Sequence, residues 1–203
     1  MKTTLQSNFN GVAYHNYVAC YGNTTRGRLD FGRMSNGTTL NRFGGGAFIE
    51  IINRNTGNWP NYYSWIVHTD DYLERSTLAE ILDGTSNTLA FSETVQGHGG
   101  DLRGFSWWGG ACHFETFLPP NSPQPDFVEQ NCVSTIRLNP PCLVHTVTTN
   151  PIRPQTHAAR SRHPTGVMAA MCDGSVRFYS NNVNLDTWRF LGSSRGGDVP
   201  GNF

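Results

Sequence analysis

Charged side chains are scarce in this chain. Asp, Glu, Lys and Arg make up 15% of its 203 residues, against about 25% in ordinary soluble domains. The 15 basic side chains balance 15 acidic ones, and Lys2 is the only lysine. A net charge of zero without a basic cluster excludes the electrostatic pattern of a nucleic-acid-binding protein.

Long apolar runs are also missing. No stretch approaches the ~18–20 residues needed to cross a bilayer, and residues 1–7 lead into polar sequence without a signal-peptide pattern. We therefore expect no membrane span. The polar bulk comes from 19 Asn, 20 Thr and 14 Ser, with 22 Gly and 11 Pro. This composition and length predict one soluble, loop-rich, mainly β domain over residues 1–203.

None of the five cysteines stands in a C-x-x-C pair, which disfavours a zinc ribbon or a thioredoxin-like motif. Cys132 and Cys142 bracket a nine-residue loop that ends in Pro140-Pro141. This spacing predicts a disulfide-closed loop, formed in an oxidising compartment outside the cell or at its surface. Buried free thiols are the alternative.

Short strands and two short helices are predicted between long irregular loops, which is a mainly β (α+β) fold. Thr77 and Glu80 have capping-box spacing and Gly84 suits a helix end, so a helix is expected over 76–84. A second helix over 185–191 begins after Asn184 as N-cap. Residues 97–165 are rich in Gly, Pro and Asn and carry few regular signals. Apolar or alternating patterns predict strands over 12–20, 47–52 and 88–95.

The clearest local prediction is a β-hairpin near the C-terminus. Asp173-Gly174 separates two apolar runs, over 166–172 and 175–180, which favours a two-residue type I′ turn. That turn pairs Met171 with Val176 and Ala169 with Phe178. All four are apolar, so this face is expected to point into the core.

His163, nine residues and Asp173-Gly174 resemble the H-x9-DG signature of a large bacterial domain family of unknown function, expanded in planctomycetes. The resemblance covers roughly residues 8–203. Further segments similar to the family are 82–88, Trp107-Trp108-Gly109, 118–122 with Pro125-Asp126, 159–164, and Trp188 with Leu191-Gly192 and 196–199.

Full-length members of that family look like prepilins, with a processed N-terminus, a long apolar helix and a β-rich extracellular domain. The resemblance implies a pilin-like antiparallel sheet that ends in the C-terminal hairpin, and assembly with other pilin-like subunits. The family's N-terminal prepilin motif and helix do not occur in this chain. The family brings no established activity.

His163 and Asp173 are the first candidates for chemistry, as an acid–base or metal pair. They cannot meet within one straight hairpin, because about 30 Å of extended chain separates them at ~3.3 Å per residue. We expect Asp173 to set the turn and His163, before Pro164, to fix a loop by hydrogen bonds. Gly174 completes this motif.

Calcium is the one cofactor for which the sequence offers ligands. Residues 83–87 carry closely spaced oxygen side chains but lack the further carboxylates of an EF-hand loop, so a helix end with a polar turn is the simpler interpretation. A calcium site could be assembled across loops from Asp83, Glu93 or Asp198. No cofactor is required by the sequence.

The other groups of potentially reactive residues match known catalytic or metal-binding motifs poorly. His98 with Asp101, and the Cys112–Glu115 segment, lack the two-histidine spacing of a zinc protease. Ser106 lacks the second glycine of a hydrolase elbow, and Cys172 would need a histidine in contact.

Clustered aromatic rings suggest a ligand platform. Flat rings stack on sugar faces when they are exposed, and they fill a core or plug loops when they are not. The candidates for ligand contact are Trp59, Tyr62, Trp65, Trp107 and Trp108.

The sequence favours a non-enzymatic protein: an extracellular or cell-surface structural or interaction domain that acts by assembly or ligand contact. The expected partners are further copies, pilin-like subunits or a surface glycan. Two alternatives stay open. One is a secreted hydrolase, metal-dependent or with a catalytic triad, whose site lies within 97–165. The other is a carbohydrate- or solute-binding module.

Overall fold

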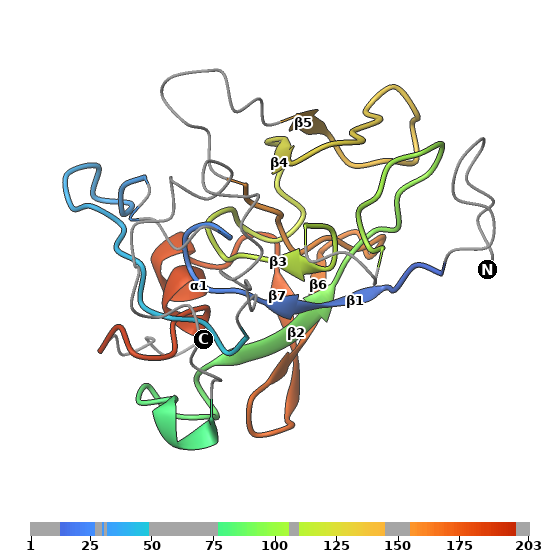
Figure 1. Cartoon of the computed structure of the whole chain (residues 1–203). Helices are drawn as coiled ribbons and strands as arrows, with labels where there is room; N and C mark the ends of the chain where they lie inside the picture. Colours follow the sequence, from blue (N-terminus) through green and yellow to red (C-terminus); the bar gives the residue numbers. More distant parts are fainter. Residues whose placement is uncertain are drawn as a thin grey trace, which may run out of the picture.

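A computed structural model describes residues 13–26, 30, 32–48, 77–105, 110–144 and 155–197. Its centre is a five-stranded sheet in the order β3-β1-β2-β6-β7 (Figure 1). The strands are β1 (Tyr17–Cys20), β2 (Leu89–Glu93), β3 (His113–Phe114), β6 (Gly166–Met171) and β7 (Val176–Ser180). The short strands β4 (Asp126–Val128) and β5 (Cys142–Val144) form a second, two-stranded sheet.

The predicted mainly β, α+β architecture is confirmed, but the large sheet is mixed where a wholly antiparallel one was expected. β3 runs parallel to β1, and β5 runs parallel to β4. Parallel neighbours need a long connection, and the irregular segments before β3 and β5 provide it. The strands expected over 12–20 and 88–95 are present in shorter form, whereas the expected strand over 47–52 lies mostly outside the described residues.

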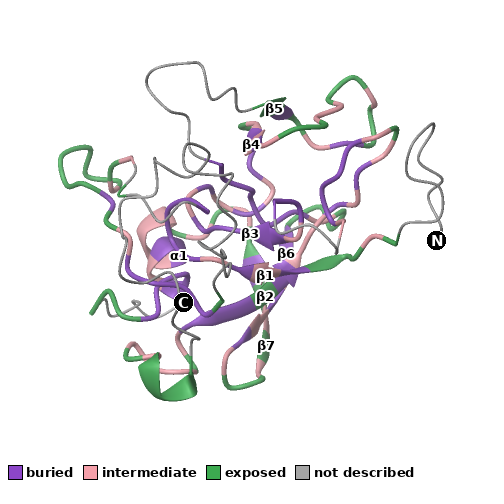
Figure 2. Ribbon diagram, in the orientation of Figure 1, coloured by how far each residue is buried: buried purple, intermediate pink, exposed green. Residues whose placement is uncertain are grey.

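Helix α1 (Leu185–Leu191) covers the inner face of the large sheet (Figure 2). Trp188 is fully buried, packs against Phe114 and Tyr179, and donates a hydrogen bond from Nε1 to the carbonyl of Leu118 at 3.0 Å. The other buried members of this apolar core are Val18, Cys20, Leu89, Ala159, Val167, Ala169, Met171 and Leu191.

The two predicted helices have different outcomes. α1 has its expected bounds, with the Asn184 side chain accepting a hydrogen bond from the amide of Thr187. The helix expected over 76–84 is only a single 3-10 turn, η2 (Leu78–Glu80), although its capping box is present. Leu78 and Leu82 are 70% and 75% exposed. A helix here would have no apolar face to bury, so it does not continue. No helix in the described ranges has the length and apolar content that a bilayer crossing requires.

The hairpin is present, but its expected turn and register are wrong by one residue. Ala170 pairs with Val176, and Met168 pairs with Phe178. The loop has three residues, 172–174, and only Gly174 has a positive φ, of 85°. This is the turn type in which a left-handed glycine forms a bulge.

The one-residue shift moves the side chains of β7 to opposite faces. Val176 and Phe178, expected in the core, are exposed, and Tyr179 is buried in their place. The outer face of the sheet therefore carries Phe91, Ala170, Val176 and Phe178 side by side.

Candidate functional site

Two segments that resemble family motifs, 118–126 and 159–164, lie against each other. Asn121 connects them, because its Oδ1 accepts a hydrogen bond from the amide of Ser161 at 2.7 Å. Its Nδ2 donates to Asn181 at 2.9 Å and to the carbonyl of Gly166 at 3.2 Å. Asn121 has a φ of 52°, a left-handed conformation that asparagine adopts more readily than most residues. This side chain fixes both motif segments to the end of the hairpin.

Arg160 and Asp126 form the centre of this region. Both are buried, and the guanidinium contacts both carboxylate oxygens at 2.8–3.1 Å. The same guanidinium donates to the carbonyls of Ser122 at 2.6 Å and Gln124 at 2.8 Å. Arg160 therefore holds the 118–126 loop through three directed contacts.

Arg103 extends the pair into a four-residue ion network of Asp101, Arg103, Asp126 and Arg160. Its Nη1 lies 2.8 Å from Asp126 and its Nη2 lies 2.7 Å from Asp101. Burial alone would raise the pKa of Asp126, but the two guanidiniums outweigh it and hold that pKa below its ordinary value. Two carboxylates and two guanidiniums leave the network with no net charge.

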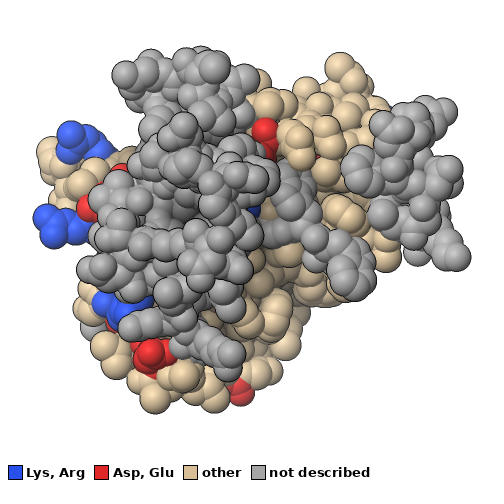
Figure 3. Space-filling view, viewed as in Figure 1, with Lys and Arg blue, Asp and Glu red and all other residues tan. Residues whose placement is uncertain are grey.

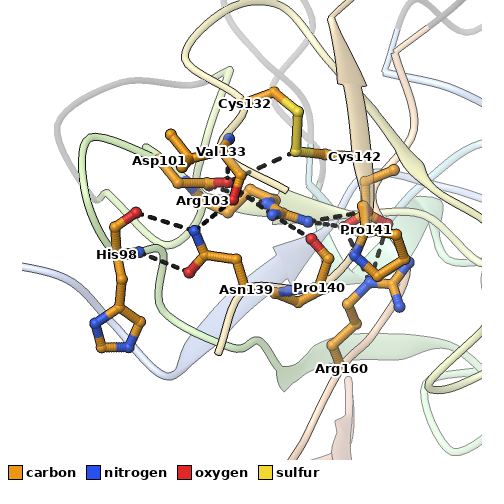
Figure 4. Close-up of a disulfide and its surroundings, with 11 residues drawn as sticks. His98, Asp101, Arg103, Cys132, Val133, Asn139, Pro140, Pro141, Cys142 and Arg160 are labelled. Carbon is orange, nitrogen blue, oxygen red and sulfur yellow. Dashed lines mark hydrogen bonds and ion pairs between the residues drawn. A yellow bond between two sulfur atoms is a disulfide. The ribbon is translucent and has the colours of Figure 1, made fainter. Parts of the chain in front are cut away.

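The predicted disulfide between Cys132 and Cys142 is present, with an S–S distance of 2.07 Å and a Cα–Cα distance of 5.8 Å. The loop that this disulfide closes lies over the ion network (Figure 4). Arg103 donates to the carbonyls of Pro140 at 2.7 Å and Pro141 at 3.2 Å. Asp101 accepts from the amide of Val133 at 3.1 Å. The cross-linked loop therefore covers the buried charges, and its backbone carbonyls and one amide form hydrogen bonds with them.

His98 and Asp101, which the sequence analysis considered as metal ligands, contact different partners. Asp101 accepts hydrogen bonds from Arg103, whereas the backbone of His98 exchanges hydrogen bonds with the side chain of Asn139, both at 2.9 Å. The imidazole of His98 points away from the network (Figure 4). Within the described ranges, no group of three His, Cys, Asp or Glu is placed to hold a metal ion.

The two ends of the H-x9-DG motif make separate contacts. His163 is exposed, and its Nε2 lies 3.2 Å from Glu93, whose other oxygen accepts from the amide of Met168 at 2.7 Å. Asp173 accepts from the amide and hydroxyl of Ser175 at 2.8 and 2.7 Å. One end therefore fixes a loop to β2, and the other shapes the hairpin turn.

The calcium candidates do not share a site in the described residues. Asp83 accepts hydrogen bonds from the Ser193 hydroxyl at 3.0 Å and from the amides of Gly196 and Gly197 at 2.9 Å each. Glu93 is engaged with His163, and Asp198 lies outside the described residues. The contacts around Asp83 are hydrogen-bond donors, which bind a carboxylate, and not the oxygen ligands that surround calcium.

A second buried titratable cluster contains His113, Glu115 and His157. The Nδ1 of His113 lies 2.7 Å from Glu115, and the two imidazole rings stack with centroids 4.3 Å apart. Burial raises the pKa of Glu115 to about 8 and lowers the pKa of His157 to about 3. The sequence marked the Cys112–Glu115 segment, but nothing local in the sequence marked His157 as its partner.

The thiols of Cys20 and Cys172 are not activated. Burial raises the pKa of the Cys172 thiol to about 11 and raises that of the buried Cys20 as well. A catalytic cysteine needs a shift in the opposite direction.

A shallow groove of about 480 Å³ runs along the motif segments. Its walls include Asn121, Pro140, Pro141, Arg162 and His163. The aromatic ligand candidates Trp59, Tyr62, Trp65, Trp107 and Trp108 lie outside the described residues.

Comparison with known proteins gives one match. Residues 53–186 match the family described as "Protein of unknown function (DUF1559)". The matched segment includes the ion network, the disulfide and both ends of the H-x9-DG motif. No curated protein and no solved structure matches the chain. Because the match spans well over half of the sequence, the chain belongs to this DUF1559 family.

Proposed function

We propose that this protein is an extracellular or cell-surface structural domain of pilin-like type, which works by associating with further copies of itself. The observation that carries the proposal is the outer face of the large sheet. Val176, Phe178 and Phe91 are 61%, 50% and 41% exposed there. They lie side by side on the strands β7 and β2, which flank β6.

The edge of the same sheet supports a strand-to-strand contact. β7 is an outer strand of this sheet, and among the described strands only β6 pairs with it. The hydrogen bonds between Met171 and Ser175, and between Asn181 and Thr165, fix which backbone groups of β7 face β6. By alternation, the amides and carbonyls of Val176 and Phe178 point outward. In the described part of the chain these groups meet no partner, so they form a template for another strand.

A second copy of the same edge fits this template. Two β7 strands that pair antiparallel about a two-fold axis form a self-complementary interface. If the axis passes at Phe178, its ring meets the same ring of the partner, and Arg177 lies opposite Tyr179. This register avoids placing like charges opposite one another.

The rest of the molecule is compatible with a scaffold. The motif side chains Asp126, Arg160 and Asn121 are engaged in contacts that hold loops together. Uncharged side chains make up most of the described surface in Figure 3. The disulfide supports an oxidising compartment.

Sedimentation velocity over a range of protein concentrations tests the proposal. The chain with its disulfide intact is expected to dimerise or oligomerise, and Phe178→Lys is expected to abolish association. Leu82→Lys, which places the same charge on an exposed leucine of another surface, is the matched control. A strictly monomeric wild-type chain, or association that persists unchanged in Phe178→Lys, would refute it.

A further inference from the structure

The two sulfur atoms of the disulfide belong to residues in different surroundings. Cys142 is buried, with 3% of its surface exposed, whereas Cys132 is half-buried in a segment without regular structure. The rate of thiol–disulfide exchange depends on which sulfur an external thiol can reach and on how readily the other sulfur leaves. The difference in surroundings therefore affects the chemistry of this bond as well as its contribution to stability.

The sulfur of Cys142 lies next to a buried carboxylate. Its Sγ is 3.7 Å from Oδ2 of Asp101, whose side chain is fully buried (Figure 4). Once the S–S bond breaks, this oxygen accepts a hydrogen bond from a thiol, whereas a thiolate in the same place would face the negative carboxylate. The two guanidiniums of the ion network are balanced by its two carboxylates. Burial and the Asp101 contact therefore both favour the thiol form of a released Cys142.

The backbone holds Cys142 in place independently of the disulfide. Cys142 is the first residue of β5 and pairs with Asp126 of β4. The carbonyl of Pro141, just before it, accepts hydrogen bonds from the amide of Asp126 at 3.0 Å and from Arg103 at 3.2 Å. A released Cys142 thiol therefore stays beside Asp101, close enough to Cys132 to form the bond again.

An external thiol meets different obstacles at the two sulfurs. To reach Cys142, an attacking thiolate would have to enter a buried region and approach the carboxylate of Asp101. Near Cys132, the neighbouring residues Ser134 and Thr135 are exposed and uncharged. Access and electrostatics therefore favour attack at the same sulfur, that of Cys132.

We propose that small external thiols of the glutathione type exchange with this disulfide at Cys132, and that Cys142 is the leaving sulfur. The attacking thiolate forms a bond to Sγ of Cys132 while the S–S bond breaks, and the electron pair of that bond passes to Sγ of Cys142. Cys142 then takes a proton from water and becomes a thiol beside Asp101. Closure is the reverse: deprotonated Cys142 attacks the mixed disulfide at Cys132 and expels the external thiolate. This modification site is independent of the self-association proposed above.

Trapping the mixed disulfide tests the direction of exchange. The folded wild-type chain is exposed briefly to reduced glutathione, quenched with acid and alkylated with N-ethylmaleimide. Trypsin cleaves after Arg137, between the two cysteines, so mass spectrometry assigns each adduct to one of them. We expect glutathione on Cys132 and maleimide on Cys142. The same chain unfolded in urea is the control, and there glutathione should be shared between both. Equal sharing in the folded chain, or a preference for Cys142, would overturn the proposal.

Two single-serine variants test the same preference without a bond that can close again. Cys142→Ser leaves the Cys132 thiol and Cys132→Ser leaves the Cys142 thiol, and because both lack the disulfide, each is the control for the other. With oxidised glutathione, Cys132 should form a mixed disulfide at least about tenfold faster, because the thiolate is the reacting form and burial lowers its fraction at Cys142. Equal rates, or a faster reaction at Cys142, would refute the proposal even if no adduct is trapped in the wild-type chain. Unfolding midpoints confirm that both variants are folded.

The contribution of Asp101 is separated from the stability of the ion network by a further pair of variants. In the Cys132→Ser background, Asp101→Asn should accelerate the reaction of Cys142 with oxidised glutathione. Asp126→Asn removes a carboxylate from the same network without changing the group next to the sulfur, so it should accelerate the reaction less. An equal acceleration in both variants would refute the role of Asp101.

Discussion

The molecule has two interiors of opposite chemistry. Under the large sheet, Trp188, Met171 and their neighbours pack through contacts without direction. Under the disulfide loop, the ion network joins segments that have almost no regular structure. Apolar packing needs the broad faces of strands and helices, whereas charges with fixed hydrogen-bond geometry can hold irregular chain in one arrangement. The difference shows how a long loop region becomes rigid without strands.

Breaking the polar interior is expected to have the largest effect. Asp126→Asn removes the carboxylate shared by two buried guanidiniums and should lower the free energy of unfolding by about 3–5 kcal/mol. Urea denaturation with the disulfide intact measures it. Asp173→Asn, at an exposed carboxylate, is the control. If the two variants lost the same free energy of unfolding, the ion network would contribute no more to stability than an exposed carboxylate.

The apolar interior should respond similarly in size but differently in character. Met171→Ala removes a buried side chain and should cost about 2–5 kcal/mol. Its loss should not change with pH, whereas the stability supplied by Asp126 is present above the ordinary pKa of 3.8 and is lost as the pH falls through its lowered folded value. Denaturation at several acidic pH values separates the two. Parallel pH profiles in Met171→Ala and Asp126→Asn would contradict the contrast.

The disulfide is expected to contribute less. Replacing Cys132 and Cys142 with serine should cost about 2–3 kcal/mol, as expected for a loop of about ten residues. Hydrogen exchange should accelerate at Val133, whose amide faces Asp101, and not in α1. Cys172→Ser, at a free thiol, is the control. Uniform acceleration across both interiors would show that they are not separate.

A pH-dependent effect is expected at Glu115, which follows the core residue Phe114 and accepts a hydrogen bond from the amide of His157. Its folded pKa of about 8 exceeds the ordinary value of 4.5. Its contribution is therefore fully present below pH 4.5 and is lost as the pH rises through about 8. Relative to Glu115→Gln, the wild-type chain should lose stability between these pH values. His157, whose pKa is lowered, acts in the opposite direction and in both proteins. A constant difference between wild type and variant would contradict the assignment.

Local signals allowed the sequence to predict several features. Asn184 and Gly192 bound α1, and the two cysteines of the disulfide lie ten positions apart in the sequence. Asp173-Gly174 located the hairpin but not its register, because the choice of turn depends on the hydrogen bonds from Ser175 to the Asp173 side chain. A difference of one residue in the length of that loop decides which side chains of β7 reach the core.

The ion network could not be derived from local patterns. Asp101 and Arg160 lie far apart in sequence, and neither stands in a periodic segment. Resemblance to the family marked the Asp126 and Arg160 segments, but it did not show that they contact each other. The hydrogen bonds that the Gly44 carbonyl accepts from residues 193–195 could not be predicted either, because no local motif indicates them.

The pairing of β2 with β6 has a consequence for synthesis of the chain. Ser92 finds its partner Ala169 only after the whole intervening segment has left the ribosome. Until then one edge of β2 is unpaired, and the large sheet lacks β6 and β7. Such non-local pairing makes folding slow and exposes strand edges to misassembly, so a nascent chain that stalls before residue 166 should be the species most prone to aggregate.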